Sequence, residues 1–351
     1  MLAPCNDAGL VSIGDKNATG VVKLKVFYRR SDIKRALLIS IVVCLFVSSI
    51  ASAVTIDWVT VGNPENIADT TGAPNPCGAV DYEYQIGKYE VTAGQYTEFL
   101  NAVAATDTYG LYNTSMDGSY GCKIQQSGDL NSYTYSVASD WENRPVNYVS
   151  WYDSLRFANW LHNGQLAGSQ DASTTEDGAY DMSGSSVVRK AGAQVWLPSE
   201  DEWYKAAYHK NDGVTGNYFD YPTSSDSTPS NDLSDPDPGN NATFYDYGYT
   251  IDGPYYRTEV GAHENSDSPY GTFDMGGNVW EWNEALIGSY RGFRGGSCSD
   301  SHDVSSSSVS NLPPLSEDSD VGFRVASVPE PCSLVLLGLG GLTLMRRRRV
   351  R

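Results

Sequence analysis

A tight glycine turn followed by a carboxylate is the feature of this sequence best suited to binding a hard cation. Residues 276–281 read GGNVWE. Glycine tolerates backbone conformations that other residues avoid, so the turn can present carbonyl oxygens, and Glu281 adds a charged oxygen. The alternative is that Glu281 pairs with an arginine and the turn has a structural role only.

A cysteine and a histidine four residues apart, Cys298 and His302, form the other pair that could do chemistry. A cysteine nucleophile needs an adjacent base and a third group that orients the base. The pair lies in an irregular, Ser-rich stretch with no identifiable third group, so the sequence gives this reading little support. His162, His209 and His263 show no metal-ligand spacing and are interpreted as structural or surface residues.

Three helices, which would position these groups, are predicted from their N-terminal caps. They follow Thr92, with Gln95 reaching back, then Ser150, and then Ser199, with Glu202 reaching back. The first two carry apolar side chains at helical spacing, which we expect in the core: Tyr96, Phe99, Leu100 and Val103 in the first, and Trp151, Leu155, Ala158 and Leu161 in the second. With 34 Gly and 24 Tyr, the rest is expected to be mostly irregular backbone.

A polar, Pro-rich segment spans residues 220–243 and includes the run DPDPGNN at 235–241. This composition buries little apolar surface, so the segment is interpreted as a surface loop. The alternative is a loop ordered by a cation. The sequence shows no internal repeat and no second domain boundary, which predicts a single domain over residues 54–328.

The first 53 residues are interpreted as a signal peptide with an N-terminal extension. Lys34 and Arg35 precede an apolar run at residues 36–47, and the small residues Ala51-Ser52-Ala53 follow it, as at a signal-peptide cleavage site. The alternative is a membrane anchor, but the apolar run is shorter than the roughly 20 residues that span a bilayer. We therefore expect export.

The other end, residues 329–351, has three parts in order. Pro329-Glu330-Pro331 is followed by an apolar stretch from Leu334 to Met345 and then by four arginines at 346–349. This layout resembles the PEP-CTERM sorting signal. The basic residues can hold the apolar stretch transiently in the membrane. The resemblance implies cutting by an exosortase and delivery to the cell surface or extracellular matrix of a Gram-negative-type bacterium.

The charge and the cysteines limit the possible partners. The chain has 24 Lys+Arg against 43 Asp+Glu, a net charge of −19, and many of the basic residues lie in the two end segments. Such acidity argues against binding nucleic acid or anionic lipid, which need a basic face. Simple solubility explains the charge equally well. A disulfide between Cys77 and Cys122 is possible in an oxidising compartment, although spacing alone does not establish it.

Several stretches together resemble the formylglycine-generating enzyme family, also called sulfatase-modifying factors. They occur in the family's order and span most of residues 54–328: IGKYEVT at 86–92, RPVNYVSW at 144–151, LPSEDEW at 197–203, DMGGNVWEW at 274–282, RGGS at 294–297 and GFR at 322–324. The resemblance implies the family's α+β fold, a compact single domain related to C-type lectins. It also implies a calcium ion with Gly277, Val279 and Glu281 as ligands.

The same resemblance shows which chemistry is missing. In the family, two cysteines after the Gly-Gly-Ser segment bind copper and oxidise a substrate cysteine to formylglycine. Here Asp300 and Ser305 occupy those positions, and Cys298 stands where an aromatic residue is usual. Carboxylate and hydroxyl oxygens are poor ligands for copper(I), which prefers thiolates. Copper is therefore not expected.

These observations favour a non-catalytic binding or structural module on the cell surface. Its partners would be an exosortase, through the tail, and an extracellular polysaccharide or cell-surface protein, through an aromatic-rich face. The alternative is an enzyme on the same scaffold, either a formylglycine-type oxidoreductase with altered ligands or another oxidase. A shared fold does not by itself carry activity.

Overall fold

The computed structural model describes residues 53–184, 186–301, 304–306 and 308–329, together with two short paired strands, β1 (Val11–Ser12) and β2 (Lys25–Val26). His302, most of the predicted signal peptide and the sorting tail from residue 330 lie outside the described residues. Internal contacts divide the chain between Ala53 and Val54. In the described part, no helix is long and apolar enough to cross a membrane.

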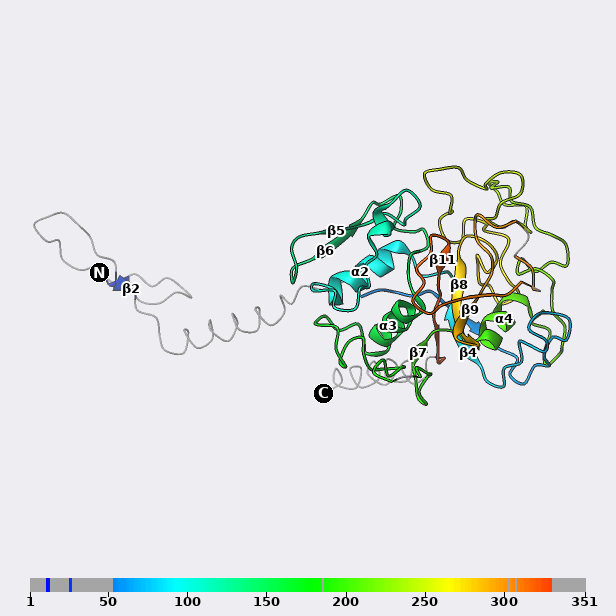
Figure 1. Cartoon of the computed structure of the whole chain (residues 1–351), viewed down its shortest axis with the longest axis horizontal. Helices are drawn as coiled ribbons and strands as arrows, with labels where there is room; N and C mark the ends of the chain where they lie inside the picture. The colour runs from blue at the N-terminus through cyan, green and yellow to red at the C-terminus, as the bar shows by residue number, and fades with distance from the viewer. Residues whose placement is uncertain are drawn as a thin grey trace, which may run out of the picture. The chain divides into compact units, whose positions relative to one another are not determined.

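The first and last segments of the domain meet in one four-stranded sheet. Its order is β3 (Trp58–Val61), β4 (Tyr84–Gly87), β12 (Ala326–Ser327) and β7 (Val195–Trp196), with antiparallel neighbours. Ala326 pairs with Ile86 on one side and Trp196 on the other. The C-terminal strand is therefore an inner strand with β4 and β7, which are labelled in Figure 1, on either side of it, and this ties the end of the domain to its centre.

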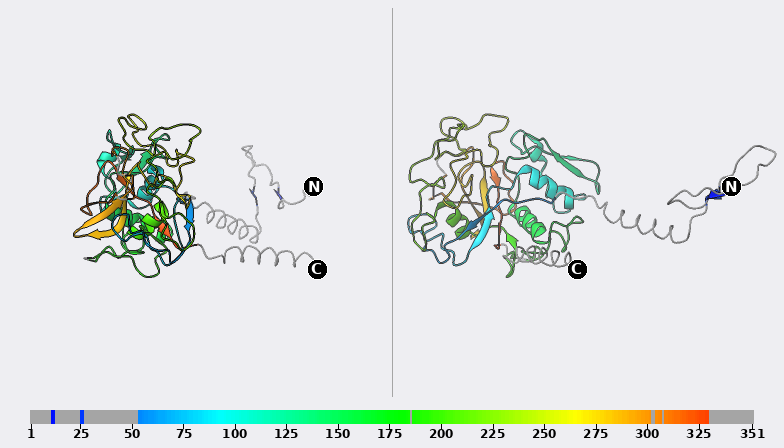
Figure 2. Two further views of the ribbon diagram at one scale, coloured as in Figure 1. Left: turned by 90° about the vertical axis from the view of Figure 1, so that its right-hand side faces the viewer. Right: turned by 180° about the vertical axis from the view of Figure 1, so that it is seen from behind.

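A second four-stranded sheet holds the glycine turn. Its order is β10 (Ser310–Leu312), β9 (Tyr290–Arg294), β8 (Trp280–Ile287) and β11 (Val321–Gly322). β8 and β9 form a hairpin that projects from the side of the domain (Figure 2). β11 runs parallel to β8, with Val321 opposite Trp280. A separate hairpin joins β5 (Ile124–Ser127) and β6 (Thr134–Val137).

The three predicted helices are confirmed. They are α2 (Ala93–Val103), α3 (Trp151–His162) and α4 (Glu200–Tyr208), and a short 3₁₀ helix, η1, spans Thr114–Asp117. Thr92, Ser150 and Ser199 each close a capping box, in which side chain and backbone satisfy each other's free hydrogen-bonding groups. The predicted core positions are buried, except that Leu161 is only partly buried.

Aromatic side chains from helices and strands fill the core between these elements. Phe99 and Phe323 pack edge to face against Tyr96, and Phe157 stacks on it, with centroid separations of 5.4–6.5 Å. Such pairs stabilise beyond the area that they bury. The result is the expected α+β domain with little regular secondary structure, in which long loops are held by specific polar contacts.

The loop at residues 220–243 shows how such contacts work. Asp237, expected in a solvated loop, is only 4% exposed. Its carboxylate accepts hydrogen bonds from the backbone N–H groups of Gly239 and Asn265 and from the side chains of Asn241 and Ser266. A buried carboxylate thus orders this loop.

The possible disulfide between Cys77 and Cys122 is not present. Both are free, buried thiols, as is Cys298. Burial raises the pKa of Cys77 to about 12 and also raises that of Cys122. All three thiols are therefore expected to be protonated and shielded in the folded domain.

Candidate functional site

Two glycine-containing segments pack against each other at the start of β8 and position the candidate site. The N–H of Gly277 donates to the carbonyl of Gly295 at 2.8 Å, and the N–H of Cys298 donates to the carbonyl of Asn278 at 3.1 Å. Gly277 has a φ of +88°, and a Cβ there would lie 2.2 Å from the carbonyl oxygen of Thr243. Only glycine permits this close approach, which brings residues 295–300 beside the turn.

Asp300, which the sequence resemblance places at the first cysteine position, is fixed by hydrogen bonds from its neighbours. Its Oδ2 accepts from Nε1 of Trp280 at 2.7 Å and from the N–H of Ser297 at 3.1 Å. The Ser297 hydroxyl donates to the same oxygen. The carboxylate therefore anchors the loop to the start of β8. Burial, with the nearby Asp300 charge, raises the pKa of Asp320.

The other sequence candidates are placed separately. The Ser305 hydroxyl lies 3.3 Å from that of Ser308. Cys298 is 4% exposed, and burial, partly offset by the Arg257 charge, raises its pKa to about 11. A protonated, shielded thiol is a poor nucleophile. His302, the suggested base for Cys298, lies outside the described residues.

These donors do not fit the copper chemistry of the family. Copper(I) prefers thiolate sulfur, whereas Asp300 and Ser305 offer oxygen and the thiol of Cys298 is buried and protonated. Among the described residues, no group of three or more His, Cys, Asp or Glu side chains is arranged to hold a metal ion. We therefore derive no redox step at this position.

Glu281, a predicted calcium ligand, makes the alternative interaction with an arginine. Arg324 donates from Nε to Oε2 and from Nη2 to Oε1, both at 2.6 Å, and Trp203 donates from Nε1 to Oε2 at 2.8 Å. Both carboxylate oxygens are thus engaged, so Glu281 in this geometry does not fit a calcium ligand. Gly277 and Val279 are also buried. Calcium binding remains a prediction, which metal analysis of the purified domain would test.

Two further carboxyl groups surround this ion pair. Glu90 is 1% exposed, and neither of its oxygens has a hydrogen-bond partner among the described residues. Burial, reinforced by the charge of Asp274, raises the pKa of Glu90 well above its usual value. Burial likewise raises the pKa of Asp274 to about 6. Burial therefore favours the neutral form of Glu90.

A row of tyrosines lies on the surface beside Asp300. The tyrosine row comprises Tyr120, Tyr256, Tyr249 and Tyr245. Successive rings are 5.7, 4.9 and 5.1 Å apart between centroids. Tyr120, Tyr249 and Tyr245 are 57%, 40% and 37% exposed. Tyr247, between two of them in sequence, is fully exposed.

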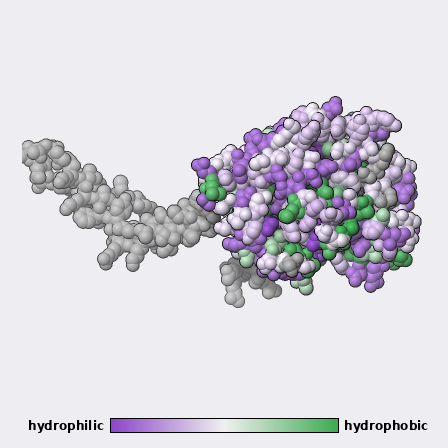
Figure 3. Space-filling model, in the orientation of Figure 1, coloured by the Kyte–Doolittle hydropathy of each residue, from purple (hydrophilic) through white to green (hydrophobic). Residues whose placement is uncertain are grey.

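Backbone contacts connect the tyrosine row to the candidate site. The N–H of Tyr245 donates to the carbonyl of Asp300 at 3.0 Å. At the other end, Nη2 of Arg257 donates to the carbonyl of Tyr120 at 2.9 Å. The loops of residues 220–260 form the upper edge of the domain in Figure 1, and Figure 3 shows mainly hydrophilic and intermediate residues along that edge. The site is thus an aromatic strip in polar surroundings.

Comparison with known families assigns the fold. The model of the sulfatase-modifying factor enzyme 1-like domain matches residues 57–328, so the chain belongs to this family. The PEP-CTERM protein-sorting motif matches residues 327–349. This motif indicates export to the cell surface of a Gram-negative bacterium and sorting by an exosortase. No match to the sequence is found among curated proteins.

Solved structures resemble the chain at low sequence identity. CarF is 21% identical, with a TM-score of 0.47, and the match covers 79% of this chain and 99% of CarF. Treponema denticola variable protein 1 is 20% identical, with a TM-score of 0.48, covering 80% and 97%. PvdO from Pseudomonas aeruginosa is 17% identical, with a TM-score of 0.44, covering 79% and 93%. At such identities only the fold is comparable.

The sequence predicts an aromatic-rich face but does not indicate which tyrosines form it. One signal was available. Tyr245, Tyr247 and Tyr249 alternate along the chain, and two of them, Tyr245 and Tyr249, pair across a turn that has Tyr247 between them. The contribution of Tyr120 had no such signal, because it comes from a distant loop.

Proposed function

We propose that the exported domain is a non-catalytic binding module that holds a neutral polysaccharide of the cell surface or extracellular matrix on its tyrosine row. The observation that carries this proposal is the continuous strip of rings beside Asp300, at the position where the family carries its reactive cysteines. A scaffold that has lost its thiolate pair but keeps an exposed aromatic strip is suited to binding.

The chemistry of tyrosine supports a sugar ligand. The rings of the row meet tilted or edge to face. The C–H groups of a pyranose can lie on the exposed part of a ring, and the tyrosine hydroxyl can exchange hydrogen bonds with sugar hydroxyls. A tyrosine side chain has only two torsion angles to immobilise, so the conformational entropy lost when it binds a ligand is small. Sugar chains repeat, which suits several rings in a row better than one deep pocket.

The charge of the chain narrows the polysaccharide class. With a net charge of −19, the protein would repel a polyanionic chain at low ionic strength. A neutral polysaccharide avoids that repulsion. A peptide ligand from another surface protein is the main competing outcome of the test.

Binding of the purified domain to neutral and to anionic polysaccharides tests the proposal. We expect retention by neutral chains, and about a tenfold weaker affinity for Tyr249→Ala and for Tyr256→Ala, equivalent to ~1.4 kcal/mol. Tyr290→Ala is the matched control, because Tyr290 is 45% exposed but lies on the β8–β9 hairpin. Equal loss in the control, or no retention by any polysaccharide, would contradict the proposal.

A further inference from the structure

The chain leaves the domain from a firmly held strand. Ser327, the last residue of β12, pairs with Gln85 and with Val195, and the N–H of Val328 donates to the carbonyl of Gln194 at 3.1 Å. The N–H of Gln194 in turn donates to Nδ1 of His162, at the end of α3, at 3.0 Å. The backbone is therefore anchored up to Val328.

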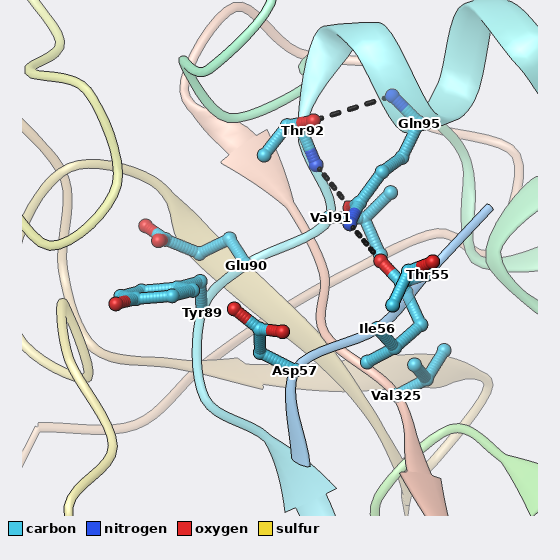
Figure 4. Close-up of a pocket in the computed structure, with 9 residues that line it drawn as sticks. All are labelled: Thr55, Ile56, Asp57, Tyr89, Glu90, Val91, Thr92, Gln95 and Val325. Carbon is cyan, nitrogen blue, oxygen red and sulfur yellow. Dashed lines mark hydrogen bonds between the residues drawn. The ribbon is translucent and has the colours of Figure 1, made fainter.

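The residues that immediately precede β12 are also held by backbone hydrogen bonds. The N–H of Gly87, at the end of β4, donates to the carbonyl of Val325 at 2.8 Å, and the N–H of Lys88 donates to the carbonyl of Asp57 at 2.7 Å. Figure 4 shows Ile56 and Val325 lining the same small pocket, of about 70 Å³. The first and last segments of the domain thus support each other, and the exit has little freedom to swing.

Only five residues, 329–333, separate Val328 from the apolar stretch that begins at Leu334. Fully extended, the six peptide steps between Val328 and Leu334 span at most about 20 Å. We call residues 329–333 the tether. A domain of this size has a radius of gyration of roughly 19 Å, so its diameter is more than twice the length of the extended tether. The tether is too short for the domain to turn freely above a membrane.

We propose that the edge of the domain around β12 and β7 faces the membrane while the tail is inserted, and that the tyrosine row points away from it. We call this edge the exit edge and define it by Gln85, His162, Gly192 and Gln194. In Figure 1, β7 lies in the lower part of the domain, whereas the yellow-green loops of residues 220–260 lie at the top. A partner in the extracellular space would therefore meet the tyrosine row first.

The residues that define the exit edge are compatible with an anionic lipid surface. Gln85, Gly192 and Gln194 carry no charge. Burial, with the charge of Lys190, lowers the pKa of His162, so its ring is neutral at neutral pH. An acidic protein close to anionic head groups is repelled through its exposed carboxylates within about a Debye length. The residues that define the exit edge add no carboxylate to that repulsion, and the exposed Asp177 near His162 is paired with Lys190.

Short-range fluorescence quenching in vesicles tests this orientation. The full chain, produced in a bacterium without exosortase and with Cys5, Cys44 and Cys332 changed to serine, is labelled at Gln194→Cys or at Tyr247→Cys. The three remaining cysteines are buried and should not react. Each labelled protein is inserted into phosphatidylethanolamine–phosphatidylglycerol vesicles that contain a lipid with a nitroxide on its head group.

We expect quenching at position 194 to be at least twofold stronger than at position 247. A matched variant with 20 Gly/Ser residues inserted after Val328 adds about 25 Å of flexible reach and should bring the two values together. Matching thermal unfolding would establish that the variants are folded. Equal quenching of the two sites at native tether length, no quenching at either, or a difference that the spacer leaves unchanged would overturn the proposal.

Discussion

Arg324 and Glu281 form a two-point ion pair at the centre of the domain, with both N–O distances at 2.6 Å and both side chains fully buried. The same guanidinium donates to the carbonyls of Gly87 and Phe273. One arginine therefore links the end of β4, the approach to the glycine turn and the start of β8. The turn beside the candidate site depends on this connection.

Removal of the arginine should be far more costly than removal of a surface cation. Arg324→Ala leaves Glu281 charged and buried, and is expected to lower the free energy of unfolding by about 3–5 kcal/mol. Lys210→Ala is the control, because Lys210 and Asp226 pair at 3.0 Å on the surface. Its expected cost is below about 1 kcal/mol. Urea unfolding gives both values, and similar losses would refute the structural role.

The contribution of Asp237 to stability should depend on pH. Burial opposes its ionisation, but the hydrogen bonds from Ser266, Gly239, Asn241 and Asn265 outweigh burial and lower its pKa. Because the folded-state pKa is below the unfolded one, the stabilisation is complete above the unfolded pKa. It is lost as the pH falls through the folded pKa.

The variant Asp237→Asn isolates this effect. It should cost about 1–3 kcal/mol at pH 7, because a charged acceptor is lost. The difference from the unsubstituted protein should shrink as the pH falls below about 4, near the unfolded pKa of an aspartate. Urea unfolding at pH 7 and pH 3 measures it, and a difference that is constant with pH would exclude the mechanism.

Substituting two glycines that have positive φ distinguishes the cost of backbone strain from the cost of a steric clash. Gly288, in the β8–β9 hairpin, has a φ of +67°, and a Cβ added there would meet no atom within 4 Å, whereas a Cβ on Gly277 would clash with Thr243. Gly288→Ala should cost about 1 kcal/mol from strain alone. Gly277→Ala should cost about 2 kcal/mol more, because the turn must shift to relieve the clash. Equal unfolding free energies of the two variants would contradict the close packing.

The sequence predicted the local features of the fold well. The helices after Thr92, Ser150 and Ser199 were recognisable because a capping box involves residues only three apart. The family motifs supplied the rest of the α+β architecture, since they occur in order along the domain. A capping box is a short-range pattern, and the family motifs are fixed stretches of sequence. Both can therefore be recognised in a single sequence.

The missing details all depend on contacts between distant segments. The Glu281–Arg324 pair joins residues 43 positions apart, so the sequence left it as an alternative to calcium. Asp237 looked like a loop residue because the partners that bury it include Asn265, 28 residues away. The tyrosine row needs Tyr120 beside Tyr256, which no local pattern indicates.

The central claim is that Asp300 and Ser305 leave this domain without the family's oxidative chemistry. The most direct test incubates copper-loaded protein, under air, with a sulfatase-type cysteine peptide and follows the peptide by mass spectrometry. The matched variant carries Asp300→Cys and Ser305→Cys, and it should bind copper(I) more tightly than the unsubstituted protein. We predict that the unsubstituted protein forms no aldehyde product, and formylglycine produced by it would contradict the account.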